Sequence, residues 1–421
     1  MIVMARALQP DVGSARPFDH TRTTDTKDAM HEPCDICLAA DSMLEDLQVS
    51  MLGMFDARVW RCSKCGFRQI RPRLDVSELR ALYPGDYFDL DSPVGYSDYA
   101  REQQRCERDA YFLARSLRRL APTGELLDVG CALGFLIEAL ERYCGWSTRG
   151  IDVSPFAAYF ARRQFGLDVR AVTLEEAAFP DARFDFIVQK DVLEHVLHPR
   201  EHLRETARIL KPGGRMWLVT PNGEANLSPL RRSAHDLAAR GEPLLPMLDQ
   251  GHLQFFSRGN LLRLFEDCGF RVVGMRSISV QRGLRALGVL PRKRRKLKTA
   301  PAGRPRPGAS RDVATHPSAH DAERAIAAGV SIGGGSRSAS AVIAPPAGTG
   351  EPRPAAPPAD SAADARTIAL YERLSMAVAR HRSAVRGTPL YFRFRHAMTE
   401  WDTLPARLEL GNDFSCVVEK R

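Results

Sequence analysis

The feature that most constrains the fold is a regular alternation of short apolar runs with amphipathic stretches between residues 125 and 278. The apolar runs have the length of β-strands, and the amphipathic stretches repeat their apolar residues at helical spacing. The strands predicted from this pattern are 125–129, 147–152, 167–172, 184–189, 215–220 and 270–278, and the helices are 135–143, 155–165, 201–210 and 258–268. Strands that alternate with helices predict an α/β fold, with a parallel sheet covered by helices on both faces.

Residues at the ends of these stretches support the same elements. Ser154 precedes Pro155, which places a capping hydroxyl before a proline in the first helical turn. Ser257 can cap the last of the four helices, and Gly269 can end it. A strand-like run at 413–419 follows a long excursion, so we expect it to complete the sheet rather than to start another domain.

The positive charge of the chain is concentrated in one segment. Sixty Lys and Arg stand against 51 Asp and Glu, which gives a net charge of +9. Eleven of the basic residues and no acid lie between Arg282 and Arg311, so subtracting them leaves −2 for the rest of the chain. The folded parts are therefore not a basic nucleic-acid-binding body. We also find no apolar run long enough to cross a membrane and no signal peptide, and we expect a cytoplasmic protein.

Four of the nine cysteines form two Cys-x-x-Cys pairs, Cys34 with Cys37 and Cys62 with Cys65, separated by 24 residues. Two such pairs at this spacing predict a four-thiolate zinc site, in which Gly66 allows the tight turn of a knuckle. Because protein atoms would fill all four positions, the zinc would be structural. A redox pair is the alternative, although nothing around either pair resembles a thioredoxin fold. The other cysteines are scattered singly, which suits a reducing compartment.

The strongest signal for a binding site is the glycine-rich turn between the first predicted strand and the first helix. Such a turn lets a nucleotide-like ligand approach the backbone and the free amides of the helix. A dinucleotide-binding fingerprint would need glycine at 130, 132 and 135, but Ala132 and Phe135 stand at two of these positions. The turn therefore favours another nucleoside ligand.

The stretch from Asp128 to Gly134 resembles the Asp-x-Gly-x-Gly-x-Gly pattern of class I S-adenosylmethionine-dependent methyltransferases, with Ala132 in place of the middle glycine. Asp152 closes the second strand, where a carboxylate can accept hydrogen bonds from ribose hydroxyls. Three later stretches, 184–196, 209–214 and 252–270, resemble further regions of the same family. The resemblance implies a seven-stranded, Rossmann-like core that binds S-adenosylmethionine.

Site residues follow from this resemblance position by position. It implies that Asp128, Gly130 and Gly134 surround the methionyl group, that Asp152 binds the ribose, that Val153 flanks the adenine, that Leu174 and Glu175 meet the adenine edge, and that Gln189 and Lys190 lie near the methyl group. Leu174 and Glu175 could instead belong to a solvated helix start.

Two histidines stand where a base could take a proton from a hydroxyl acceptor: His195 after the fourth strand and His252 ahead of the last helix. Each could instead stabilise a loop by hydrogen bonding. The sequence around Glu194 shows no second partner for a metal ion, so we predict no metal there.

The predicted organisation is a flexible tail (1–30), a small zinc ribbon (31–72), a tyrosine-rich connector (73–120), the methyltransferase core (121–281), a disordered basic and Pro/Ala/Gly-rich insertion (282–365), and a helix with the final strand of the core (366–421). The connector could form a lid over the site or pack the ribbon on the core.

We expect methyl transfer to a hydroxyl of a small molecule or saccharide, because enzymes with this layout resemble small-molecule and glycan methyltransferases. An RNA methyltransferase is the first alternative, since a ribosomal RNA guanine methyltransferase group shares the layout. A non-catalytic scaffold, which binds partners through the ribbon and the basic tract 291–298, is the second. The sequence specifies neither the acceptor atom nor the oligomeric state.

Overall fold

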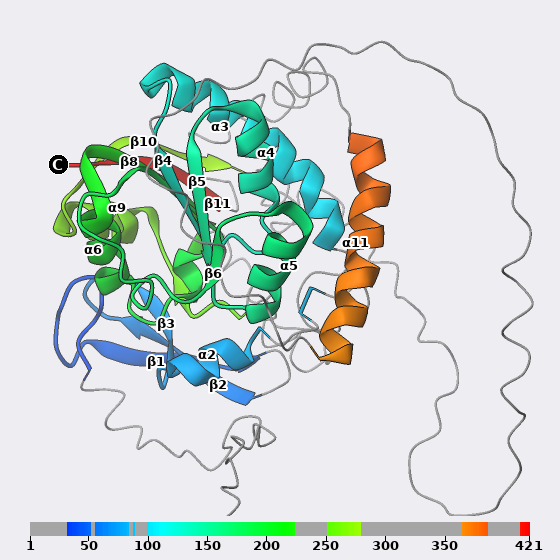
Figure 1. Cartoon of the computed structure of the whole chain (residues 1–421). Helices are drawn as coiled ribbons and strands as arrows, with labels where there is room; N and C mark the ends of the chain where they lie inside the picture. The colour runs from blue at the N-terminus through cyan, green and yellow to red at the C-terminus, as the bar shows by residue number, and fades with distance from the viewer. Residues whose placement is uncertain are drawn as a thin grey trace, which may run out of the picture. The chain divides into compact units, whose positions relative to one another are not determined.

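The computed structural model describes residues 32–51, 55–83, 87–88, 99–223, 251–278, 364–385 and 413–421 (Figure 1). The predicted flexible tail, the basic tract and nearly all of the predicted insertion lie outside these residues. In the part of the chain that is described, no helix is long and apolar enough to cross a membrane.

A seven-stranded sheet forms the centre of the core. Its strand order is β10-β11-β8-β7-β4-β5-β6. The strands are β4 (Glu125–Val129), β5 (Ser147–Asp152), β6 (Val169–Ala171), β7 (Phe184–Lys190), β8 (Leu210–Pro221), β10 (Phe270–Ile278) and β11 (Asp413–Lys420). The five strands from β8 to β6 run parallel, whereas β11 runs antiparallel to both of its neighbours. The final strand therefore completes the sheet, as the sequence predicts.

Helices cover both faces of this sheet, because alternate strand residues are buried on opposite sides. Leu126 packs with α3 (Glu102–Leu120) and α4 (Phe135–Tyr143), whereas Leu127 belongs to a cluster that includes side chains of α6 (Pro199–Ile209) and α9 (Arg258–Asp267). Figure 1 shows α4 and α5 (Pro155–Phe165) across the sheet from α6 and α9. The predicted two-sided parallel architecture is confirmed.

The predicted caps at Ser154 and Ser257 are also confirmed. The Ser154 hydroxyl accepts a hydrogen bond from the Ala157 amide, and Ser257 forms a reciprocal capping box with Asn260. The largest boundary difference within the core is at β8, which begins at Leu210 rather than at 215. The pairing with β7 shifts register between Phe184 and Phe186, which accommodates the glycine-rich start of β8 as an irregular strand. The bounds of β6 and α6 also differ by one or two residues from the predicted 167–172 and 201–210.

A second sheet of four strands joins the N-terminal cysteine module to the core. It consists of β1 (Met43–Met51), β2 (Phe55–Cys62), β3 (Arg68–Arg71) and β9 (Gln254–Phe255), in that order and antiparallel. The first three strands come from the module, but β9 lies between β8 and α9 in the chain. The sequence did not predict β9, because two residues are too short to show a strand period.

The connector supplies α2 (Val76–Ala81), the short 3₁₀ helix η1 (Tyr99–Arg101) and an aromatic cluster. Tyr87 and Phe88 are buried with Leu133 and Phe135, which belong to the first turn and α4, and with side chains of α11 (Ala365–Val385). The ring centroids of Phe88 and Tyr99 lie 5.1 Å apart. Tyr87, Phe88 and Tyr99 thus pack beside the turn that follows β4.

Candidate functional site

The turn that follows β4 lies directly against the end of β5. The amides of Gly130 and Cys131 donate to the Ile151 carbonyl at 2.8 and 3.1 Å. The Ala132 amide donates to Oδ2 of Asp152 at 2.8 Å. The ends of β4 and β5, which the sequence predicts to line one pocket, therefore lie side by side. The hydrogen bond between the Ala132 amide and the Asp152 carboxylate joins them directly.

Asp152 also accepts a hydrogen bond from the Ser154 amide, at 2.9 Å to Oδ1. Burial raises the pKa of Asp152 above its usual value, while the amides of Ser154 and Ala132 oppose this shift. A carboxylate has about four lone-pair sites, so two backbone bonds leave acceptor positions for hydroxyls. The geometry fits a carboxylate held in place to bind further donors.

Asp128 and Lys190 lie on neighbouring parallel strands. Asp128 is only 4% exposed, and burial raises its pKa to about 8; Lys190 opposes the shift and Asp152 adds to it. Lys190 itself donates to Oδ2 of Asp109 in α3 at 2.7 Å. Burial alone would lower the pKa of Lys190, but Asp109 raises it. Lys190 is therefore a charged partner of α3.

Gln189 and Glu175 belong to a different hydrogen-bond chain. The Gln189 amide donates to Thr206 Oγ1 at 2.9 Å, and its Oε1 lies 3.2 Å from His202 Nε2. The other ring nitrogen of His202 lies 3.1 Å from Glu175 Oε1. Burial would raise the pKa of Glu175, but His202 lowers it to about 2. These two predicted cofactor residues thus contact α6.

Val153 and Leu174 occupy the remaining predicted cofactor positions. Val153 is half-buried beside Asp152, and Leu174 is buried in the cluster that contains Leu127.

The two predicted bases lie beside each other, although they are far apart in the sequence. The ring centroids of His195 and His252 are 4.8 Å apart. His195 Nδ1 lies 3.1 Å from the Gly251 carbonyl, which can only accept, so Nδ1 carries the proton and Nε2 is free to accept one. Burial lowers the pKa of His195 to about 4, and burial followed by the nearby His195 lowers that of His252. Both rings are therefore neutral at pH 7.

Glu194 adds a buried carboxyl group to this histidine pair. Its Oε2 accepts from the Thr220 hydroxyl at 2.8 Å, and burial raises its pKa. Ligand atoms of Glu194, His195 and His252 lie within 4.8 Å of one another. The sequence prediction missed this arrangement, because His252 reaches His195 only through the fold.

The histidine pair lies near the first turn. A Cβ added to Gly130 would meet Val192 Cγ2 at 2.5 Å, so the turn packs against the segment that leads to His195. Tyr83 contacts His195 with ring centroids 6.1 Å apart. Burial raises the pKa of Tyr87 to about 12, with a further contribution from Asp152. Tyr83 thus lies beside His195, and Tyr87 lies near the Asp152 carboxylate.

The four cysteines of the N-terminal pairs converge. Sγ atoms of Cys34 and Cys65 lie 3.6 Å apart, and those of Cys37 and Cys62 lie 3.5 Å apart. Tetrahedral zinc with bonds of about 2.3 Å requires sulfur atoms roughly 3.8 Å apart. Burial would raise the pKa of Cys62, but the Ser42 hydroxyl and backbone amides lower it to about 6. The cluster is compatible with one zinc ion.

A sheet with this strand order, one antiparallel strand and a glycine-containing turn after β4 defines the Rossmann-like class I methyltransferase fold. A family model described as a methyltransferase domain matches residues 100–274. The chain therefore contains a class I S-adenosylmethionine-dependent methyltransferase domain.

Curated relatives carry the name ubiquinone biosynthesis O-methyltransferase. The protein from Caulobacter vibrioides is 41% identical over 104 residues, which cover 23% of this chain and 40% of that protein. The protein from Xanthomonas axonopodis pv. citri is 31% identical over 161 residues, which cover 37% of this chain and 66% of that protein. The matches thus span less than two thirds of either relative.

Among solved structures, an S-adenosylmethionine-dependent methyltransferase from Thermotoga maritima, described as a possible histamine N-methyltransferase, is 22% identical. The match covers 47% of this chain and 84% of that one, with a TM-score of 0.33.

Proposed function

We propose that this chain transfers a methyl group from S-adenosylmethionine to a hydroxyl group of a small molecule or saccharide. The observation that carries the proposal is the bond between Ala132 in the first turn and Asp152 at the end of β5. It holds a partly buried carboxylate at the edge of a glycine-containing turn, where a nucleoside can approach the backbone. The name shared by the curated relatives supports a hydroxyl acceptor.

In this proposal Asp152 binds the ribose, and Asp128, Gly130 and Gly134 surround the methionyl group. The cofactor, when bound, supplies a methyl group on a positively charged sulfur that is itself the leaving group. Such a positive charge favours the ionised form of Asp128. Val153 flanks the adenine and Leu174 meets its edge, while the roles of Glu175, Gln189 and Lys190 near the cofactor stay predictions from the resemblance.

His195 is the proposed base. Its Nδ1 proton is held by the Gly251 carbonyl, so Nε2 is the atom that can accept the proton of the hydroxyl acceptor. Its depressed pKa keeps the ring neutral, as a base must be before transfer. His252 is the second candidate, and its Nδ1 has no hydrogen-bond partner among the described residues.

The four converging cysteines are proposed to hold a structural zinc ion, because they would leave no coordination position for a substrate. None of the nine cysteines, all of which lie in the described residues, forms a disulfide, and this fits the proposed reducing compartment, the cytoplasm.

Calorimetry with S-adenosylhomocysteine tests the cofactor part of the proposal. Folded protein that gives no binding heat would refute it and leave a non-catalytic role. Methyl transfer is then measured as S-adenosylhomocysteine release with a panel of phenols and saccharides. Activity on RNA alone, falling steeply with salt, would replace the acceptor class.

Separate His195→Gln and His252→Gln variants identify the base. Loss of the base should lower kcat by roughly 10²- to 10⁴-fold, with S-adenosylhomocysteine affinity unchanged. If both variants keep full activity, neither histidine takes the proton.

A further inference from the structure

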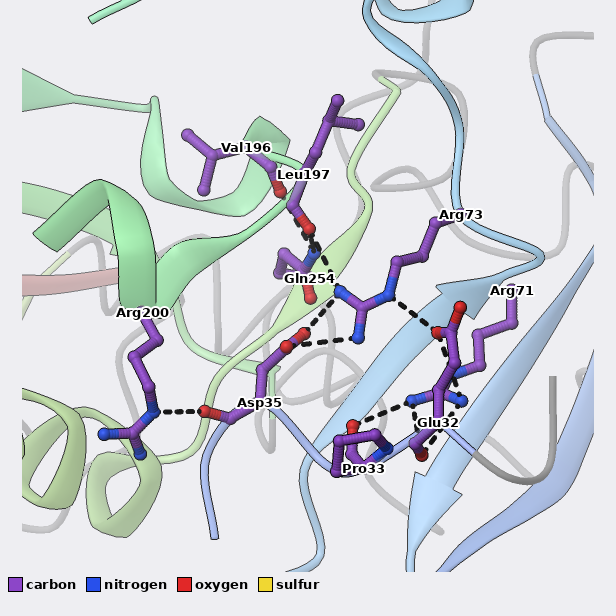
Figure 2. Close-up of polar contacts among 9 residues, drawn as sticks. All are labelled: Glu32, Pro33, Asp35, Arg71, Arg73, Val196, Leu197, Arg200 and Gln254. Carbon is purple, nitrogen blue, oxygen red and sulfur yellow. Dashed lines mark hydrogen bonds and ion pairs between the residues drawn. The ribbon is translucent and has the colours of Figure 1, made fainter. Parts of the chain in front are cut away.

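The first cysteine knuckle, Cys34 to Cys37, lies between two arginines that come from different parts of the chain (Figure 2). Arg200 in α6 donates from Nε to the Asp35 carbonyl at 2.9 Å and from Nη2 to the Ile36 carbonyl at 2.6 Å. Its side chain is only 4% exposed. The core thus binds the backbone of the knuckle between its two cysteines.

Arg73, which follows β3, binds the same knuckle through its side chain. Its Nη1 and Nη2 donate to the two carboxylate oxygens of Asp35 at 2.7 and 3.1 Å, and its Nε donates to Glu32 at 2.8 Å. Such a two-pronged pair fixes both groups in orientation as well as in distance. The side chains of Arg73 and Asp35 are 16% and 12% exposed, so water competes little for these bonds.

The guanidinium of Arg73 also reaches the catalytic domain directly. Its Nη1 donates to the Leu197 carbonyl at 3.2 Å, two residues after the proposed base. The Gln254 amide in β9 donates to the Val196 carbonyl at 3.0 Å and to Leu197 at 3.4 Å. Figure 2 shows the carbonyls of Val196 and Leu197 directed toward these side-chain nitrogens. One backbone stretch is therefore bound from two sides.

The segment that carries His252 is bound to the same framework. The Ile70 amide in β3 donates to the Leu253 carbonyl, and the Leu253 amide donates to the Glu194 carbonyl, each at 2.8 Å. Backbone bonds therefore run from the module through Leu253 to the residue before His195. By contrast, the bonds described above for the first turn involve β5 and not the module.

We propose that Arg73 is a positioning residue, which makes the placement of the His195 segment (residues 193–200) depend on metal binding at the first cysteine knuckle. This inference rests on the proposed function, in which His195 is the base. Zinc fixes the turn that carries Asp35; Asp35 orients the guanidinium of Arg73; and the guanidinium holds the Leu197 carbonyl. Loss of zinc would then loosen the histidine side of the site and spare the first turn.

The test is amide hydrogen exchange followed by mass spectrometry on the zinc-loaded full chain. Arg73→Gln removes the bridge but leaves all four cysteines. We expect amides within 193–200 and 251–255 to exchange about tenfold faster or more, as for one lost charge-assisted hydrogen bond. Amides of the first turn, residues 129–134, should keep their rates, and zinc content should stay at one ion per chain.

Arg208→Gln is the matched control. Arg208 also binds two carboxylates, Glu205 and Asp181, together with the Phe179 carbonyl, but at the other end of α6. It should leave exchange in 193–200 unchanged. Arg73→Lys keeps the charge without the fork and should restore part of the protection, which also covers the case in which Arg73→Gln fails to fold.

Chelation completes the test, because two perturbations of one path are not additive. Stripping zinc from the wild type should reproduce the exchange pattern of Arg73→Gln within 193–198, and stripping it from the variant should add little there. Amides beside Arg200, which binds the knuckle backbone directly, are compared separately. Additive effects, faster exchange spread evenly over the core, or a variant that matches Arg208→Gln would each overturn the proposal. S-adenosylhomocysteine binding, measured on the same samples, reports separately on the proposed function.

Discussion

Replacing Gly134 with alanine should destabilise the core more than the same replacement at Gly166, and the structure explains the difference. Both glycines have a left-handed backbone, with φ of 79° and 68°. An L-residue in this conformation costs about 1–2 kcal/mol. An added Cβ would meet nothing within 4 Å at Gly166, but at Gly134 it would lie 2.7 Å from Leu167 Cδ1 and 3.0 Å from Ala161 Cβ.

The two contacts at Gly134 differ in how easily they can give way. The Leu167 methyl lies at the end of a side chain that can rotate, whereas the Ala161 Cβ is fixed to the backbone of α5. The helix itself must therefore shift, and overpacking of this kind costs about 1–3 kcal/mol. We expect a loss of about 1–2 kcal/mol for Gly166→Ala and of about 2–5 kcal/mol for Gly134→Ala.

The assay is unfolding in urea, monitored by tryptophan fluorescence. The free energies of unfolding of the two variants and the wild type are compared on condition that all three have the same slope against urea concentration. S-adenosylhomocysteine affinity should fall only for Gly134→Ala, because Gly134 is the turn residue. Equal losses of stability would show that α5 yields without cost and would refute the packing argument. An unchanged affinity in Gly134→Ala would separate that glycine from the cofactor.

Three further predictions concern the carboxylate, the cysteines and the proposed base. Asp152→Ala should weaken S-adenosylhomocysteine binding roughly 10- to 150-fold, as expected for lost charged hydrogen bonds; a near-normal affinity in calorimetry would place the ribose elsewhere. Cys62→Ser should release zinc and lower the melting temperature, whereas a metal-free wild type that melts normally would contradict the zinc assignment. The pKa of His195 is about 4 in the folded chain and near 6.5 when unfolded, so the unfolded chain binds more protons between these values. The free energy of unfolding should therefore fall by about 3 kcal/mol as pH drops from 6.5 to 4, and His195→Gln should remove that part of the slope.

Local patterns in the sequence were sufficient for most of the fold. The strand and helix periods of the core depend on which face each residue buries, and the caps at Ser154 and Ser257 depend on neighbours three residues away. Both are encoded within a short window. The start of β8 was missed because Lys-Pro-Gly-Gly is typical of a loop, and only pairing with β7 makes it a strand.

The site was harder to predict, because its contacts join distant segments. No local pattern links His195 with His252 or β3 with β9. The face of the sheet on which the Gln189 side chain lies could have been predicted, since successive strand residues alternate between the two faces. Ile187, two residues earlier, packs in the cluster that includes α6, and Gln189 bonds to α6 as well, whereas Lys190 reaches α3 on the other face.

The pairing of β3 with β9 limits how this architecture can be recombined. A gene fusion that exchanged only the N-terminal module would bring a strand edge that had never been matched to the host's β9, including the position whose amide donates to the Leu253 carbonyl. A working chimera would need to carry residues 251–257 with the module. Inheritance of the two segments should therefore be linked, although nearly two hundred positions of the sequence separate them.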